Sequence, residues 1–574
     1  MSLLAPERLL GALVCCATAF GAGELPGRYF RLLDTGAAEI VRRLDAEPGA
    51  GLEKLEASRG WKHFPSAVLV AAVLYSSKAP ENPRYHDRAT LALAERVGDL
   101  LVSEQEKGRY NTRLDHHRDT YMWLDAYRLL ESELGTERRE RWKKALLQNL
   151  EPLAADVARR QDYPWYQAPF IGTSPNHYAL WSSTVYLAGR VFHNPEWEKL
   201  GARVMHRFAA VEQAPDGYWG EHSQAGPTTG YDFLTETGVA LYAEFSQDPA
   251  AIQALRRSTD FHKYFTYPDG MPVETINDRN RHWFLSTWGH FGFSHFGDGR
   301  RYAEFLTALY PAEPISLEGL GRIAQDALYY HRGSTTHIPL DESRFHYRMQ
   351  IPAGIRKAGP WFVCLSGILA PPVPFNQFFL DRQGSLSVFH EKYGQILSGG
   401  GSKRQPELAS FWEKMSQQTF HLPISSRFQM EEQEDRLALA YHSFFSETSV
   451  TIPQDRSVEI RTRITPKARR VTASMNLQVC LKAGEVLETG SGRKFTVGAE
   501  AVKLAPAELG GEIRHHGWVL KLDPAAGFEW PVYPYNPYAN GPEKSLEYAV
   551  ALVATPLEAR EIRFSVADAA DGRP

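Results

Sequence analysis

A histidine and a tyrosine stand nine positions apart in the stretch "DGYWGEHSQAGPTTGYDF", residues 216–233. The Gly, Pro and Thr residues around His222 are typical of a connection between helices, and Tyr231 begins the next predicted helix. Histidine is the usual base near neutral pH, and a phenol can donate a proton to a departing oxygen. The pair is therefore a candidate for acid–base catalysis, with a purely structural hydrogen-bonded pair as the alternative.

Two more polar residues stand at a predicted helix start in "GTSPNHYALWSSTVYLAGR", residues 172–190. Ser174 followed by Pro175 is a strong start signal, because serine caps the helix and proline suits its first turn. Asn176 and His177 therefore fall in that first turn, at the rim of a helical bundle. As an alternative, Asn176 only assists capping and His177 only bonds to a loop carbonyl.

A third stretch, "VETINDRNRHWF", places Arg279 and Arg281 at another predicted helix start. These cations either face the same end of a helical ring as the residues above or form a solvated, charged surface. In "YNTRLDHHRDTY" the adjacent His116 and His117 point apart on a helix, which is poor spacing for metal ligands. The sequence therefore indicates no metal site and no required cofactor, and a structural divalent metal stays open.

Asparagine, histidine, tyrosine and arginine together suit a β-elimination on a uronic acid within a polysaccharide. Amide and guanidinium groups neutralise the uronate carboxylate, which acidifies the proton on C5. We expect Asn176 and Arg281 to hold this carboxylate, with Arg279 and His177 as second choices. A base then removes the C5 proton, and an acid protonates the leaving oxygen O4.

Tyr231 is the predicted acid on O4. It also serves as the base if both protons lie on one face of the sugar, whereas His222 is the base if they lie on opposite faces. The other predicted substrate-binding residues are Glu221 and three tryptophans that suit either stacking on sugar rings or core packing: Trp165, Trp219 and Trp283.

Amphipathic helices must position these residues. From about residue 30 to residue 332, apolar residues recur at helical spacing, as in "RATLALAERVGDLLVSE", and short loops between them imply stacked helical hairpins. After about residue 340 the period becomes two, as in "SVEIRTRI" and "EIRFSV". We therefore predict an α+β chain, with a helical domain over residues 23–335 and an antiparallel β-sandwich over residues 340–574.

The segment from Asp216 to Tyr231 resembles the polysaccharide lyases that cut hyaluronate and chondroitin. Their D-G-(aromatic)-x-x-x-H segment and T-G-Y-like turn are matched here, and the order Asn176, His222, Tyr231, Arg281 is kept along the chain. The resemblance implies an incomplete (α/α) toroid followed by antiparallel β-sheets. The segment "PNHYALW" is equally similar to the Asn-His element of alginate and heparinase-type lyases, which would promote His177 over His222. A glucuronan-cleaving family stays open as well.

The net charge and the N-terminal residues indicate which partners the chain can bind and where it is located. The net charge is −4 over 574 residues, so there is no global case for nucleic-acid binding, and an acidic polysaccharide would need a local basic patch. Residues 1–22 have Arg8, an apolar stretch and small residues, which is the anatomy of a secretory signal, with a first helix of the mature fold as the alternative. We therefore expect a secreted or periplasmic protein. No later stretch is apolar enough to span a bilayer.

Two other functions are considered beside a lyase. A glycoside hydrolase on uronyl oligosaccharides needs two carboxyl groups flanking the bond, and the sequence offers several. These are Asp125, Asp216, Glu221, Asp232, Glu236 and Asp278. A non-catalytic glycan-binding protein would need only aromatic loops and arginines. Neither alternative accounts for the series of asparagine, histidine, tyrosine and arginine.

Overall fold

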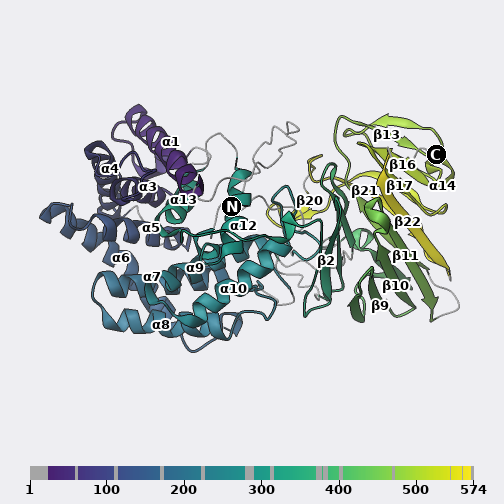
Figure 1. The fold of residues 1–574 in the computed structure, drawn as a ribbon, viewed down its shortest axis with the longest axis horizontal. Helices are drawn as coiled ribbons and strands as arrows, with labels where there is room; N and C mark the ends of the chain where they lie inside the picture. The colour runs from purple at the N-terminus through teal and green to yellow at the C-terminus, as the bar shows by residue number, and fades with distance from the viewer. Residues whose placement is uncertain are drawn as a thin grey trace.

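A computed structural model describes most of the chain and has helices in its first part and strands in its second (Figure 1). The described residues are 24–57, 63–108, 114–167, 174–221, 226–277, 279, 290–310, 316–369, 378, 386–399, 405–467, 472–542, 544–558 and 560–569. The export signal expected at residues 1–22 lies outside them. None of the described helices is long and apolar enough to cross a membrane.

A ring of almost fully buried helices forms the inside of the helical region. Neighbours along the ring pack against each other, and the last helix returns to the first. In ring order they are α3 (Pro65–Ser76), α5 (Leu114–Leu130), α7 (Pro175–Val191), α9 (Thr229–Ser246), α11 (His290–Phe293) and α13 (Leu317–Tyr329). In α3 nearly every side chain is buried, as expected of a helix that is apolar all round, and α7 and α9 are almost as buried although they carry polar residues.

A second set of helices, which are amphipathic, surrounds this ring. They bury one face and expose the other, which explains the helical periodicity of the sequence. They are α1 (Glu24–Ala46), α2 (Leu52–Leu55), α4 (Arg88–Glu106), α6 (Thr136–Arg160), α8 (Pro195–Ala210), α10 (Pro249–Tyr264) and α12 (Gly297–Ala308). The predicted helical toroid is confirmed.

Helices α7 and α9 run parallel and side by side. Gly238 of α9 lies against the backbone of Ala179 in α7, where an added Cβ would come within 2.8 Å of the Ala179 carbonyl carbon. Further along both helices, the Tyr186 and Tyr242 rings are 5.0 Å apart. The N-termini of α7 and α9 therefore lie at the same end of the ring, and this end carries both Asn176 and Tyr231.

The β region consists of two large sheets and a short hairpin, all antiparallel. The first sheet has the order β1 (Arg344–Arg348), β2 (Ala353–Ala358), β3 (Trp361–Ser366), β4 (Leu386–His390), β5 (Gly394–Ser398), β12 (Thr472–Val479), β21 (Val550–Pro556), β18 (Gly527–Val532) and β15 (Val502–Leu504). Strand β6 (Phe411–Met415) pairs with β12 and with β7 (Gln418–Phe420).

The second sheet has the order β14 (Lys494–Thr496), β13 (Val486–Thr489), β16 (Glu512–His515), β17 (Trp518–Lys521), β22 (Glu561–Asp568), β11 (Ser457–Pro466), β10 (Phe444–Thr451), β9 (Glu434–Ala440) and β8 (Ser425–Met430). The hairpin is β19 (Tyr535–Asn536) with β20 (Gly541–Pro542), and α14 (Pro506–Leu509) is a single turn. The predicted alternation is confirmed in β11 and β22, which pair with Ile460 opposite Phe564. One apolar core holds residues of both sheets, and their arrangement as a sandwich stays a prediction.

The helical and β regions meet over an aromatic contact. Tyr218, Phe261 and Tyr267 pack with Phe362 and Phe389 of the first sheet. The Asp216 carboxylate accepts hydrogen bonds from the backbone amides of residues 350 and 351, at 2.7 and 3.3 Å. The loop that leads into α9 is thus held by the β region.

One buried carboxyl group in the ring has a consequence for pH. Glu236 of α9 is fully buried and has no hydrogen-bond partner among the described residues. Burial, with the nearby carboxylates of Asp326 and Asp232, raises the pKa of Glu236 well above its ordinary value of 4.5. A raised pKa in the folded state means that stability is fully present below the ordinary value and is lost as the pH rises through the folded pKa.

We therefore expect Glu236→Gln to melt at a higher temperature than the parent protein at pH about 8, and the gain to shrink toward pH about 4. A gain of one kcal/mol corresponds to about 2–4 °C in a domain of 150–250 residues and to less in a larger cooperative unit. Thermal unfolding at several pH values measures the difference. The exposed Glu151→Gln is the control and should change little. A melting difference that does not vary with pH would contradict the assignment.

Candidate active site

The start of α9 is fixed from several sides. Tyr231 is half-buried in its first turn. Asn277 Oδ1 accepts a hydrogen bond from the Thr229 amide at 3.2 Å, which satisfies one of the free amides of the helix N-terminus. Next to Tyr231, the buried Asp232 accepts a hydrogen bond from the Trp219 backbone amide at 2.7 Å. Its other carboxylate oxygen lies 3.0 Å from His262 Nε2. Tyr231 therefore stands on a rigid support.

A buried ion pair lies beside Tyr231. Arg279 and Glu221 are 1% and 4% exposed, and Arg279 Nη2 donates to Glu221 Oε2 at 2.6 Å. Arg279 Nη1 donates to the Phe378 carbonyl at 2.6 Å, and its guanidinium carbon is 5.3 Å from the centre of the Tyr231 ring. The guanidinium therefore lies beside the Tyr231 ring. Glu221, predicted to bind substrate, has its partner inside the protein.

The β region adds a tyrosine that the sequence analysis missed. Tyr538 lies in the turn between β19 and β20, and its phenol lies near that of Tyr231. Burial, with Tyr231 and Glu221 nearby, raises the pKa of the Tyr538 phenol well above its ordinary value of 10.0, against the opposing charge of Arg279. The signal in the sequence is the aromatic run "PVYPYNPYANGP", residues 531–542, at a pair of very short strands.

The residues at the start of α7 lie where the sequence analysis placed them. Asn176 is 1% exposed, and the Ser174 hydroxyl donates to its amide oxygen. The helix begins at Pro175 as predicted, but the expected cap is wrong, because the Ser174 side chain bonds to Asn176 and makes no capping hydrogen bond. His177 is half-buried, and its ring stacks on Trp181 with centres 5.3 Å apart.

Two of the predicted sugar-stacking tryptophans are buried. Trp219 is 1% exposed, stacks flat on Phe208 at 5.2 Å and donates from Nε1 to the Phe208 carbonyl at 3.2 Å. Trp165 is 3% exposed and is part of the same core. Both therefore pack in the core here. Exposed rings do occur next to Trp165, at Tyr163 and Tyr166.

Three predicted site residues, His222, Arg281 and Trp283, lie outside the described residues. Of the carboxylates considered for a hydrolase, Asp278 lies outside them too. The described carboxyl groups either accept hydrogen bonds within the protein or are fully buried. Asp125 accepts from Arg128 and Tyr329, Asp216 from backbone amides, Asp232 from Trp219, and Glu221 from Arg279, while Glu236 is fully buried. They do not offer a matched pair of free carboxyl groups.

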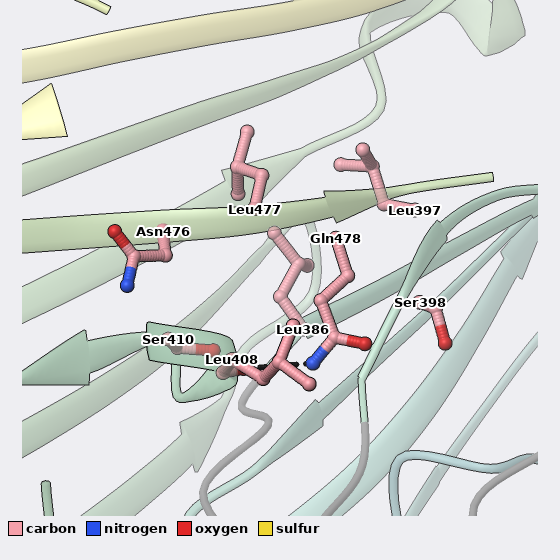
Figure 2. A pocket seen from close by; sticks show the side chains of 8 residues that line it. All are labelled: Leu386, Leu397, Ser398, Leu408, Ser410, Asn476, Leu477 and Gln478. Atoms are coloured by element: carbon pink, nitrogen blue, oxygen red, sulfur yellow. Dashed lines mark hydrogen bonds between the residues drawn. The ribbon is translucent and has the colours of Figure 1, made fainter. Parts of the chain in front are cut away.

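A pocket in the β region is too small for a sugar. It lies around β12, where Gln478 Nε2 donates to the Leu408 carbonyl at 2.7 Å (Figure 2). Its walls are Leu386, Leu397, Ser398, Leu408, Ser410, Asn476, Leu477 and Gln478. The accessible space of about 10 Å³ is the size of one water molecule. This pocket is therefore not a candidate sugar site.

Comparison by sequence and by structure gives different results. No protein-family model and no curated protein sequence matches this chain. A solved chondroitin AC lyase of Streptomyces coelicolor A3, in complex with chondroitin sulphate, superposes with a TM-score of 0.51 and 12% identity over 95% of this chain and 82% of that chain. A mutant heparan sulfate lyase of Pedobacter heparinus superposes with a TM-score of 0.50 and 11% identity, over 89% and 76%.

The chain has a polysaccharide lyase fold. At these identities the likeness shows the fold alone. Within this lyase fold, Tyr231 and Asn176 occupy the N-terminal ends of neighbouring inner helices. Arg279, paired with Glu221, lies beside the Tyr231 ring, and Tyr538 lies near its phenol. The arrangement can protonate or deprotonate a bound group beside a fixed positive charge.

Proposed function

We propose that this chain is a polysaccharide lyase that cleaves a uronic-acid-containing polysaccharide by β-elimination and leaves a uronyl end unsaturated between C4 and C5. The observation that carries the proposal is Tyr231, a phenol on a rigid helix start beside the buried Arg279–Glu221 pair. Its position in a lyase-type toroid, at the helix ends that also carry Asn176, supports the same reaction.

In the proposed mechanism, Asn176 and Arg281 donate hydrogen bonds to the uronate carboxylate and stabilise the charge that develops when the C5 proton leaves. His177 is the second choice for this role. Tyr231 protonates O4 as the bond to the next sugar breaks. The C5 proton goes to Tyr231 if both protons lie on one face of the sugar and to His222 if they lie on opposite faces.

We assign Arg279 a role other than binding the uronate carboxylate. Its guanidinium is 1% exposed and already donates to Glu221 and to the Phe378 carbonyl. Because its guanidinium already donates these two hydrogen bonds and is buried, Arg279 is poorly placed to bind the substrate carboxylate. We assign it to positioning Tyr231 and to stabilising negative charge on the phenol oxygen.

Glycosaminoglycans are the first substrates to test, because the two solved structures compared above are lyases for chondroitin and heparan sulfate. Alginate and glucuronan complete the panel. Cleavage outside the cytoplasm fits such large charged polymers and the export signal expected at residues 1–22. The reaction is followed by the ultraviolet absorbance of the conjugated C4=C5 bond.

We expect absorbance to rise with at least one polymer. New reducing ends without absorbance would instead identify a hydrolase. Binding without any cleavage would identify a glycan-binding protein. These three outcomes separate the lyase from both alternatives in one experiment.

The tyrosine from the β region leads to a smaller prediction. Tyr538→Phe removes the hydroxyl near Tyr231 and leaves the ring, so we expect kcat to fall about 5–10-fold, the equivalent of about 1–1.5 kcal/mol for one polar contact. The pH profile of kcat should shift as well, because a polar group next to the proposed acid is removed. Tyr535→Phe is the matched control on the same hairpin, since its hydroxyl donates to Asn540. Equal kinetics of both variants would contradict the role of Tyr538.

A further inference from the structure

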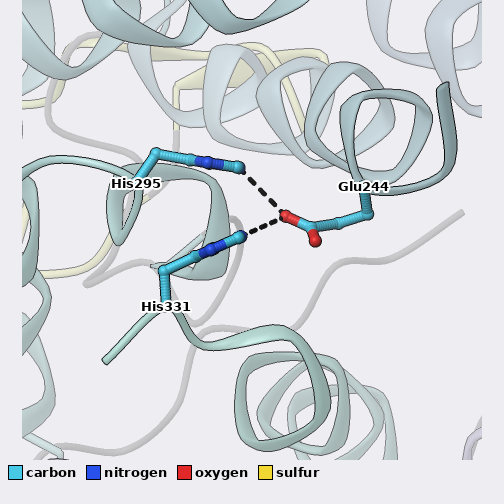
Figure 3. Close-up of side chains that lie close together, drawn as sticks. All are labelled: Glu244, His295 and His331. Carbon is cyan, nitrogen blue, oxygen red and sulfur yellow. Dashed lines mark hydrogen bonds and ion pairs between the residues drawn. The ribbon is translucent and has the colours of Figure 1, made fainter. Parts of the chain in front are cut away.

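Two histidines and a glutamate from three separate segments meet at one point of the helical region (Figure 3). Glu244 lies near the C-terminal end of α9, His295 between α11 and α12, and His331 just after α13. His331 Nε2 lies 2.7 Å and His295 Nε2 lies 2.9 Å from the same carboxylate oxygen, Glu244 Oε1. The ring centres of the two histidines are only 3.9 Å apart.

Hydrogen bonding accounts for only part of this arrangement. His331 Nε2 and Glu244 Oε1 form a hydrogen bond of normal geometry. His295 Nε2 is buried and close to the same oxygen, yet it makes no hydrogen bond of acceptable geometry with any described residue. In a metal site the nitrogen lone pair points at the cation and not at the neighbouring ligand atom. When a histidine nitrogen and a carboxylate oxygen bind one cation, the nitrogen lone pair therefore points beside the oxygen and not directly at it.

The chemistry of the three groups selects the kind of ion. Imidazole nitrogen and carboxylate oxygen bind zinc at about 2.0–2.2 Å, so two ligands of a tetrahedral site stand about 3.3 Å apart. The observed separations of 2.7 and 2.9 Å need to widen by only about half an ångström. Calcium and magnesium prefer oxygen ligands throughout, which two histidines do not supply.

The surroundings hold the ligands in place and leave one side open. The His331 amide donates to Ser294 Oγ at 2.9 Å, which ties the segment after α13 to the residue before His295. Arg300 Nη1 donates to the Ser294 carbonyl at 2.8 Å. The side chains of Glu244 and His295 are each 11% exposed and that of His331 is 37% exposed. Water can therefore reach the group and serve as a fourth ligand.

We propose that Glu244, His295 and His331 bind a divalent transition-metal ion of the zinc type. The ion joins the end of α9, the turn before α12 and the chain as it leaves the ring for the β region. Glu244 follows Tyr231 by thirteen residues on the same helix, which is about 20 Å along its axis. The ion is therefore distinct from the candidate active site and stabilises the ring.

The test uses the full-length protein after treatment with a chelator and its removal. We expect calorimetric titration with Zn²⁺ to show one site per chain that His331→Ala and Glu244→Gln each weaken more than about 100-fold, since even the loss of a residue that only hydrogen-bonds to a metal ligand costs about 10–100-fold. Zn²⁺ should raise the melting temperature, and Mg²⁺ and Ca²⁺ should not. His206→Ala is the matched control, because His206 Nδ1 lies 2.8 Å from a single carboxylate, that of Asp248, at the surface.

The melting temperature also separates loss of the site from loss of the fold. In chelator, we expect His331→Ala and Glu244→Gln to melt within a few degrees of the parent protein, and only the rise with Zn²⁺ should disappear. No Zn²⁺ binding by the parent protein would overturn the proposal. Equal Zn²⁺ binding by the parent and both variants would overturn it as well. Neither readout depends on lyase activity.

Discussion

Tyr231→Phe is expected to lower kcat on the cleaved polysaccharide by about 10²–10⁴-fold, the usual contribution of a positioned proton donor or acceptor. The phenol oxygen is the group proposed to protonate O4, and phenylalanine keeps the ring but carries no proton to transfer. The ring also keeps its place beside Arg279, so substrate binding should change little. Initial rates from the absorbance of the C4=C5 bond measure kcat, and calorimetry with the inactive variant measures binding.

The same substitution further along α9 serves as the control. Tyr242 lies near the other end of this helix, where its hydroxyl donates to Asp248 Oδ2 at 3.0 Å. Tyr242→Phe loses one hydrogen bond at a place remote from the proposed chemistry, so its kcat should stay close to that of the parent protein. Full activity of Tyr231→Phe would refute the assigned acid. Equal loss in both variants would indicate damage to α9 instead.

Arg279→Met is expected to destabilise the fold by about 3–5 kcal/mol and to lower kcat/KM by more than tenfold. The substitution leaves the Glu221 carboxylate buried without its cation, which is the costly way to break a buried pair. It also removes the positive charge next to Tyr231. Denaturant unfolding gives the stability, and the absorbance assay gives kcat/KM. Arg138→Met, at a partly exposed arginine that pairs with both Glu95 and Asp99, is the control and should cost far less stability.

A double variant separates the two effects of Arg279. In Glu221→Gln with Arg279→Met, neither buried charge remains, so most of the stability lost in the single variant should return. Activity should stay low, because the charge beside Tyr231 is still missing. Recovery of kcat/KM together with stability would show that Arg279 acts only on the fold. No recovery of stability would contradict the account of the buried pair.

The sequence by itself determined the elements. A helical or a two-residue period shows which face of a segment is apolar. The residues of that segment alone determine this pattern. The helix start at Pro175, the alternation in β11 and the change from helices to strands were therefore predicted correctly. The candidate status of Tyr231 and Asn176 also follows from local spacing, since each stands in the first turn of a helix.

Only the tertiary structure decided which residues meet. Glu221 pairs with Arg279, and Tyr538 of the β region reaches Tyr231, although nothing in the local pattern relates these positions. Trp219 was open to two interpretations, because a flat apolar ring suits a sugar and a core equally, and in the structure this ring is buried against Phe208. Glu244, His295 and His331 show no metal-binding spacing along the chain. They converge because three helices of one ring end close together, and that closeness is a property of the packed chain.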